Sequence, residues 1–170
     1  MAGLMLQRRR RTLHSAAEDE SDILLAVHHR DAGDRFRQRI AGEVDSITAV
    51  VRHHLGLSDG DTCAVLSPAS WIQGGFNLCV LVDVKIRGSS STPASRRLVV
   101  FRCPLPHKLA EASYPGTLDE KVACEVGTYG WMQEHCPDIR IPHLYAFGFS
   151  DGSQVCLPEP LGLMLAQLLG

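Results

Sequence analysis

The middle of the sequence reads Phe76-Asn77-Leu78-Cys79-Val80-Leu81-Val82-Asp83-Val84-Lys85-Ile86 and, after a polar loop, Arg97-Leu98-Val99-Val100-Phe101-Arg102-Cys103. Both stretches are rich in β-branched and aromatic residues, which favour strands. The loop between them, residues 88–95, contains Gly, Ser, Thr, Pro and Ala and offers nothing to pack in a core. Parallel pairing would need a crossover helix, which this loop cannot supply, so we predict that the two strands pair antiparallel.

Further strands are predicted on both sides of this pair. Residues 63–66 form a short apolar stretch before it, and Gln73-Gly74-Gly75 forms a turn that leads into the long strand. Pro104 and Pro106 end the strand that contains Arg102, because proline cannot donate to a β-ladder. Residues 143–149 and 154–157 predict two more strands around the turn Ser150-Asp151-Gly152-Ser153.

Two helices are predicted around these strands. Over about residues 34–55, apolar side chains recur every three or four positions, with Asp34 as a cap and Gly56 as a stop: Phe36, Ile40, Val44, Ile47, Val51 and Leu55. A second helix is expected over about residues 117–135, where Thr117 and Glu120 match a capping box. The element order predicts an α+β fold, with one helix inserted in a five-stranded antiparallel sheet and an amphipathic helix before it.

Composition excludes several classes of protein. The 170 residues contain 17 Lys and Arg against 19 Asp and Glu, a net charge of −2, whereas a dedicated nucleic-acid binder is strongly basic. No apolar run approaches the roughly 20 residues of a membrane helix. The six cysteines are scattered without a CxxC pair, which favours free thiols in a reducing compartment. We therefore expect a cytoplasmic protein with neither a nucleic-acid nor a membrane partner.

The two ends of the sequence differ from its middle. Residues 1–33 mix Arg8-Arg9-Arg10-Arg11 with Glu18-Asp19-Glu20, and we interpret them as a flexible charged leader. Residues 158–170 are an atypical leucine-rich tail. The predicted globular part is residues 34–157, and both tryptophans, Trp71 and Trp131, are expected to pack rather than to stack on bases.

Several segments, in this order and spacing, carry a resemblance to a known family. They are Gly75-Phe76-Asn77-Leu78-Cys79, Leu98-Val99-Val100-Phe101-Arg102-Cys103-Pro104-Leu105-Pro106, Tyr114-Pro115-Gly116-Thr117 with Asp119-Glu120-Lys121, Glu125-Val126-Gly127-Thr128-Tyr129 and Ile141-Pro142-His143-Leu144-Tyr145-Ala146-Phe147-Gly148. The set resembles the fungal branch of the aminoglycoside phosphotransferase-like proteins, over about residues 50–155. The resemblance implies a protein-kinase-like fold, of which residues 34–157 would be the amino-terminal, small lobe.

The resemblance also implies a nucleotide site. In kinase-like small lobes, the loop between the first two strands covers the phosphates of ATP, and small residues let the backbone approach them. Gly74, Gly75, Phe76 and Asn77 would occupy that loop. The loop is not a Walker motif and lacks a full GxGxxG pattern. A simple hairpin turn is therefore the alternative interpretation.

A cation and a carboxylate complete the implied site. In the family, a strand cation contacts the α- and β-phosphates and is held by a helix glutamate. These roles would fall on Glu125 and on Arg102, where protein kinases and antibiotic-modifying relatives carry lysine and many members of the fungal branch carry arginine. Arginine keeps the charge but replaces a compact ammonium group by a planar fork. A structural ion pair between sheet and helix is the alternative, and under either interpretation we hypothesise that Arg102 and Glu125 pair.

The residues that would transfer a phosphoryl group are not found where the family carries them. Transfer needs a catalytic aspartate and Mg²⁺ ligands, which the family places in its large lobe. Here His28-His29-Arg30-Asp31 precedes the small lobe, and His135-Cys136-Pro137-Asp138 precedes the fourth strand. We therefore expect a truncated kinase-like lobe that is inactive alone, with ATP as its implied ligand, bound weakly or not at all, and without Mg²⁺ ligands. The alternative is a non-catalytic α+β interaction module that self-associates or docks a partner through the exposed lobe face.

Overall fold

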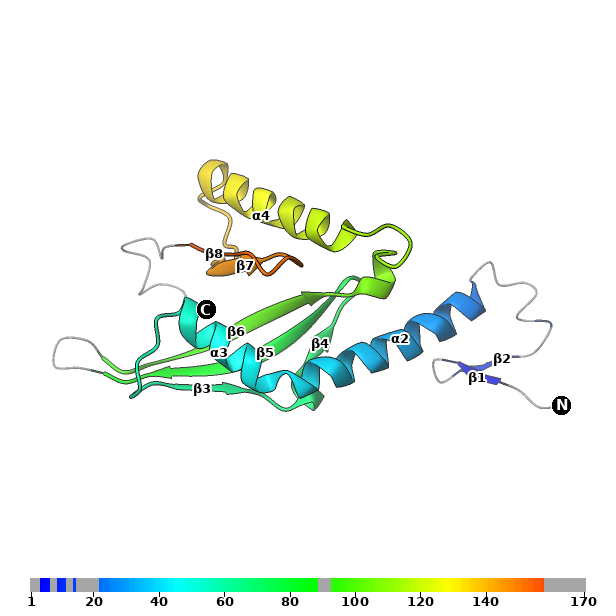
Figure 1. The fold of residues 1–170 in the computed structure, drawn as a ribbon, viewed down its shortest axis with the longest axis horizontal. Helices are drawn as coiled ribbons and strands as arrows, with labels where there is room; N and C mark the ends of the chain where they lie inside the picture. Colours follow the sequence, from blue (N-terminus) through cyan, green and yellow to red (C-terminus); the bar gives the residue numbers. More distant parts are fainter. Residues whose placement is uncertain (1–3, 7–8, 12–13, 15–21, 89–92, 158–170) are drawn as a thin grey trace.

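An antiparallel sheet built around the two central stretches organises the fold (Figure 1). Strands β5 (Asn77–Ile86) and β6 (Ser95–Pro104) pair antiparallel, from Asn77 opposite Pro104 to Ile86 opposite Ser95. Strands β3 (Thr62–Val65) and β4 (Ile72–Gln73) pair with the other edge of β5, at its two ends. The antiparallel pairing predicted for the long strands is therefore confirmed.

The structure is a computed structural model that describes residues 4–6, 9–11, 14, 22–88 and 93–157. Strands β1 (Leu4–Leu6) and β2 (Arg9–Arg11) form a hairpin within the predicted charged leader. The leucine-rich segment 158–170 lies outside the described residues.

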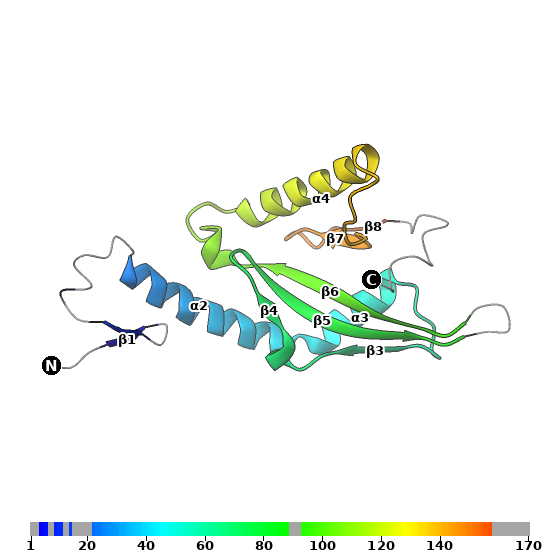
Figure 2. The same ribbon diagram turned by 180° about the vertical axis from the view of Figure 1, so that it is seen from behind.

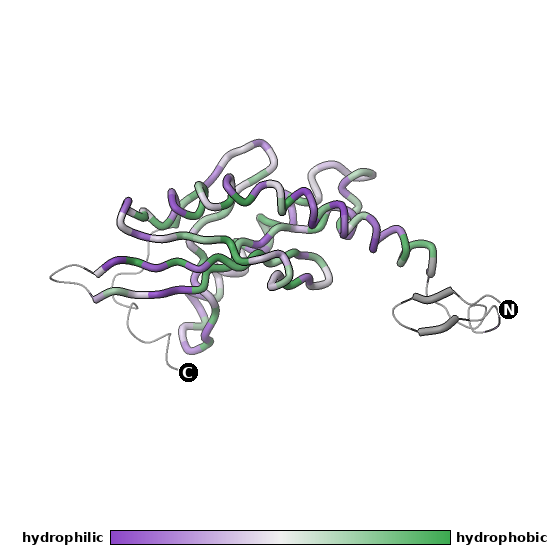
Figure 3. Tube along the Cα trace, turned by 90° about the horizontal axis from the view of Figure 1, so that it is seen from below, coloured by the Kyte–Doolittle hydropathy of each residue, from purple (hydrophilic) through white to green (hydrophobic). Residues whose placement is uncertain are grey.

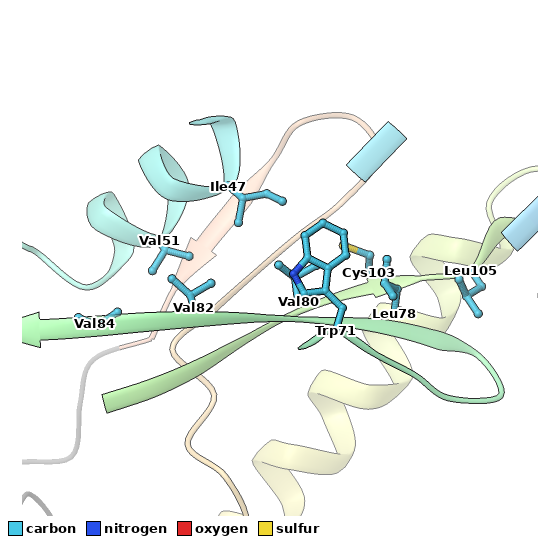
Figure 4. Packing of buried hydrophobic residues seen from close by; sticks show 9 residues of the cluster. All are labelled: Ile47, Val51, Trp71, Leu78, Val80, Val82, Val84, Cys103 and Leu105. Carbon is cyan, nitrogen blue, oxygen red and sulfur yellow. The ribbon is translucent and has the colours of Figure 1, made fainter. Parts of the chain in front are cut away.

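One face of the sheet carries the hydrophobic core. Side chains alternate along β5, so that Leu78, Val80, Val82 and Val84 are all fully buried. Ile47 and Val51 of helix α3 (Val44–His54) point onto this row, and Trp71, Cys103 and Leu105 extend it (Figure 4). Burying each such aliphatic side chain contributes about 1.5–3 kcal/mol. In Figure 3 green, hydrophobic stretches run through the central strands, and the start of α2 is green as well.

The helix predicted over residues 34–55 is two helices, and its predicted start is wrong. Helix α2 (Ile23–Gly42) begins before Asp34, and the Asp22 carboxylate caps it by accepting from the Leu25 amide at 2.8 Å. Leu24 and Leu25 stay exposed, so no burial pattern marks this first part of the helix. A break at Gly42–Glu43 then separates α2 from α3.

Helix α4 (Thr117–His135) has the predicted bounds, but its start is capped differently. Gly116, with φ of 101°, occupies the N-cap, and no side chain there makes a cap bond. The Glu111 carboxylate instead accepts from the Gly116 and Leu118 amides and from the Thr117 hydroxyl, each at 2.8 Å. The predicted capping box of Thr117 with Glu120 is therefore wrong.

The last two described strands pair only with each other. Strand β7 (Ala146–Gly148) and strand β8 (Gln154–Cys156) form a separate hairpin, which lies between α4 and β6 (Figures 1 and 2). A single five-stranded sheet is therefore not confirmed. The described residues form a four-stranded sheet and two-stranded hairpins, and the fold is α+β with antiparallel sheets.

Other predictions concern single residues. All six cysteines lie in the described part and are free thiols, as predicted. Trp71 is buried, with 5% of its surface exposed, and donates to the Leu66 carbonyl, so its packing role is confirmed. Trp131 is 57% exposed and stacks on His135, so its predicted role in packing is wrong.

In the part that the structure describes, no helix combines the length and apolar character that crossing a membrane requires.

Candidate functional site

Four polar side chains converge where β5, β6 and α4 meet. Glu125 Oε1 accepts from Arg102 Nη2 at 3.3 Å and from Asn77 Nδ2 at 3.5 Å, and it also forms an ion pair with Lys121. Lys121 Nζ donates to Asn77 Oδ1 at 3.2 Å. We call Asn77, Arg102, Lys121 and Glu125 the polar cluster.

Regular geometry places each member of the polar cluster. Arg102 alternates with buried Cys103, so its side chain leaves the sheet on the face opposite the core. Asn77 begins β5 and lies near the same end of the strand pair, where Cys79 is directly opposite Arg102. Lys121 and Glu125 are four residues apart on α4, so they share one face of the helix. The predicted contact between Arg102 and Glu125 is present.

The turn between β4 and β5 adjoins the polar cluster. The Gly74 amide donates to the Asn77 carbonyl at 2.9 Å, and the Leu105 amide donates to the Phe76 carbonyl at 2.8 Å. Neither Gly74 nor Gly75 is among the glycines with positive φ, and a Cβ on Gly75 would meet nothing within 4 Å. The fold itself therefore does not require glycine at Gly75, and the lack of a side chain keeps the turn open to solvent.

The turn and the polar cluster line one open groove of about 360 Å³. Its walls include all the residues predicted for the nucleotide site, together with Lys121: Gly74, Gly75, Phe76, Asn77, Arg102 and Glu125. A neighbouring groove of about 370 Å³ shares Arg102, Lys121 and Glu125 and continues along α4 past Tyr129 and Met132. Volumes of this order are at the low end for small-molecule sites.

Two cations and one carboxylate give the polar cluster a net positive charge. Burial is the largest influence on the pKa of Glu125 and raises it, but the Lys121 hydrogen bond, the charges of Arg102 and Lys121 and the Asn77 hydrogen bond together lower it below the usual value. Glu125 is therefore ionised at neutral pH. The cluster's remaining charge favours an anionic ligand.

The two cations differ in how much they meet solvent. The Arg102 side chain is 40% exposed and the Lys121 side chain 15% exposed. An anion in the groove would therefore meet the exposed Arg102 guanidinium. It would meet the Lys121 ammonium group where that group lines the groove wall. Within residues 22–88 and 93–157, no three His, Cys, Asp or Glu side chains converge as metal ligands.

Lys121 is the member of the polar cluster that the sequence did not reveal as a site residue. A lysine on an amphipathic helix usually faces solvent, so its place in the segment Asp119-Glu120-Lys121 did not by itself mark it as a site residue. Its spacing of four residues from Glu125 was the available clue, since side chains at i and i+4 are neighbours on a helix.

Comparisons with known proteins do not assign a function to this chain. No family model, no curated protein and no solved structure matches this chain.

Proposed function

We propose that this chain is a kinase-like small lobe, similar to the fungal branch of the aminoglycoside phosphotransferase-like proteins, whose groove binds the phosphates of ATP. The observation that carries the proposal is the polar cluster beside the Gly74–Gly75 turn. The turn would cover the phosphates, Arg102 and Lys121 would contact their oxygens, and Glu125 would hold both cations in place.

The order of the elements along the chain supports this proposal. A glycine turn, a strand pair with a cation on its outer face and a helix with a facing glutamate follow one another, as in a kinase-like lobe. Six residues chosen from the sequence resemblance line a single groove. These residues come from three segments of the chain: the turn at residues 74–77, β6 and α4.

The chemistry of the groove also supports phosphate as the ligand. Arginine presents a planar fork of N–H donors that matches phosphate oxygens, and lysine is a compact phosphate-binding charge. Each hydrogen bond to a charged group contributes about 1.5–3 kcal/mol when it is well formed. The apolar side chains Ile72, Phe76 and Cys79 beside the cluster offer a surface for a base or sugar.

Two features depart from the family's pattern. The sheet has four strands rather than five, and arginine takes the place of the lysine that protein kinases and antibiotic-modifying relatives carry on this strand. The proposal is for nucleotide binding, not for turnover: His29-Arg30-Asp31 is part of helix α2 rather than of a catalytic loop. We expect no phosphoryl transfer by this chain above the rate of an Arg102→Ala control.

Calorimetric titration with ATP tests the proposal. We expect ATP and inorganic tripolyphosphate to bind the wild-type chain and adenosine to bind far more weakly. Arg102→Met and Lys121→Met should each weaken ATP binding about tenfold, the effect of losing roughly 1.4 kcal/mol of charge-assisted contact.

Arg96→Met is the matched control. Arg96 lies on the same strand and the same face as Arg102, opposite Lys85, and pairs with Asp83 at 2.7 Å. Six residues of strand place it about 20 Å from the groove. ATP affinity should be unchanged in this variant. Equal losses in Arg96→Met and Arg102→Met, or no ATP binding at millimolar concentration, would overturn the proposal.

One observation favours the second candidate function, a non-catalytic interaction module. Leu98 and Val100 on the outer face of β6 are 59% and 47% exposed, and exposed apolar patches often mark interfaces. Sedimentation of the wild-type chain over a concentration series tests whether this face pairs with a second copy. Self-association that Val100→Lys abolishes would support the module, and a monomer at all concentrations would exclude pairing through this face.

A further inference from the structure

A cluster of histidines joins the amino-terminal part of α2 to η2 (Pro106–Lys108), a single 3₁₀ turn after β6. The His29 and His107 ring centroids are 5.6 Å apart, and His28 lies 6.3 Å from His29. Lys108 Nζ is 2.9 Å from His29 Nδ1. We call His28, His29, His107 and Lys108 the histidine cluster.

The helix approaches this cluster closely because Gly33 lies at the crossing point. Gly33 is buried, and a Cβ added there would lie 3.3 Å from Gln73 Nε2 and 3.7 Å from His107 Nε2. A larger residue would push the His107 ring or the Gln73 amide away. The close contact between α2 and η2 therefore depends on glycine at position 33.

The contact with Lys108 constrains the protonation of His29 at one ring nitrogen. A lysine ammonium group can only donate, so His29 Nδ1 must accept and carry no proton. His29 also has a hydrogen bond to the backbone of His107. The His107 Nε2 atom is buried and has no partner among the described residues. The arrangement fits neutral histidines and has no acceptor in place for an added proton on His29 Nδ1.

The surrounding charges oppose protonation as well. Burial, the Lys108 charge and His28 lower the pKa of His29, against a hydrogen bond to the His107 backbone and the Asp22 charge, which raise it. Burial, His29, Lys108 and His28 lower the pKa of His107. Asp22 is the acidic group that acts on the cluster, and its influence on His29 is the smallest of those named. From β4 the facing group is the neutral amide of Gln73.

The remainder of α2 is attached in a different way. Phe36, Ile40 and Ala41 pack against the hydrophobic core. Arg37 lies over the Trp71 ring at 5.7 Å and donates to the Pro68 and Trp71 carbonyls. None of these contacts depends on a histidine. The two parts of α2 therefore respond differently to a change in charge at the histidine cluster.

We propose that the histidine cluster is a pH-sensitive clasp that holds the first part of α2, residues 23–33, on η2 at neutral pH and releases it in mildly acidic solution. Protonation of His29 removes the acceptor for Lys108 and places a second cation beside it. Protonation of His107 adds a third. Residues 36–42 stay packed, so the release is local and does not unfold the sheet.

The direction of the pH dependence follows from the lowered pKa values. A histidine whose pKa is lower in the folded state stabilises the contact fully above its unfolded value of about 6.5, and this stabilisation is lost as the pH falls below that value. The clasp is therefore closed at pH 7.5 and opens as the pH is lowered toward 5.

Hydrogen exchange of the backbone amides, corrected for the intrinsic effect of pH, tests the clasp in the full chain. From pH 7.5 to pH 5.5, protection of residues 26–33 should fall at least tenfold more than that of residues 47–54 in α3. The double variant His29→Gln with His107→Gln removes both titrating groups and should abolish this difference. The control His53→Gln, at an exposed position on α3, should retain it.

A second measurement applies if the double variant does not fold. NMR titration of the wild-type chain should show His29 and His107 both titrating below pH 6.5. Equal losses of protection in α2 and α3, or titration of both histidines at or above pH 6.5, would overturn the proposal.

Discussion

Glu125 is the residue on which the polar cluster depends. A single carboxylate oxygen meets Arg102, Lys121 and Asn77, which come from a strand, a helix and a strand end. A phosphate entering the groove would compete with Glu125 for the two cations, so the carboxylate positions them and also limits how tightly they hold an anion. Because the Glu125 carboxylate is partly exposed, solvent screening keeps each of its ion pairs weak, and a phosphate can compete with it for the two cations.

A double-mutant cycle measures the pairing of Arg102 with Glu125. Both side chains are more than one-third exposed, at 40% and 36%, so we expect a coupling of only about 0.5–1 kcal/mol. Chemical unfolding of Arg102→Ala, Glu125→Ala and the double variant provides the values. Additive losses of stability would show that the two side chains do not interact in solution.

The Glu111 carboxylate gives the start of α4 a pH-dependent cap. Its bonds to the Gly116 and Leu118 amides and to the Thr117 hydroxyl lower the pKa of Glu111. The cap is therefore fully effective above the unfolded value of about 4.5 and is lost as the pH falls below it. Glu111→Gln should lower the Tm at pH 7, because its amide nitrogen cannot accept from these donors, and should flatten the acid dependence of stability.

Glu120→Gln is the control for the Glu111 variant. It removes a charge from the first turn of the same helix without removing the cap. An equal loss of Tm in the two variants would attribute the effect to the helix dipole and not to the carboxylate's hydrogen bonds.

The two faces of the β5–β6 pair carry different kinds of side chain. The core face carries the buried residues Leu78, Val80, Val82 and Val84, whereas the outer face carries Arg102, which lines the groove, and the exposed residues Val100 and Leu98. The strict alternation of side chains makes this division sensitive to register. A slip of one residue would bury Arg102 and expose the core.

Matched valine substitutions test this assignment of faces. Val82→Thr places a hydroxyl in the core and should lower the free energy of unfolding by about 1–3 kcal/mol. Val100→Thr, on the exposed face, should change it by less than about 0.5 kcal/mol. Urea unfolding of both variants provides the comparison. Equal losses, or a larger loss for Val100→Thr, would contradict the register.

At the scale of the whole molecule, helices cover the sheet unequally. Helix α3 and the second part of α2 cover the core face, while α4 meets the other side only at the end where the polar cluster lies (Figures 1 and 2). This arrangement leaves the groove open and the apolar side chains of β6 exposed. A nucleotide or a partner surface has room to bind there.

Local sequence patterns predicted where helices and strands lie better than they predicted which strands pair and which side chains meet. The bounds of α4 and the contact of Arg102 with Glu125 follow from periodicity and resemblance, and both are present. The hairpin of β7 and β8 is local, but whether it joins the main sheet depends on contacts distant in sequence, which strand propensity does not encode. Lys121 was missed for a similar reason, since its role exists only once Asn77 is brought beside it.

The most direct test of the account is a map of backbone and arginine side-chain NMR shifts during titration with ATP. We predict that the largest changes occur at the amides of residues 74–77, at the Arg102 guanidinium and around Lys121 and Glu125. Residues near the Arg96–Asp83 pair, at the other end of the strands, should change little. Saturable shifts confined to a surface away from residues 74–77 and Arg102, or no shifts at all, would contradict nucleotide binding in this groove.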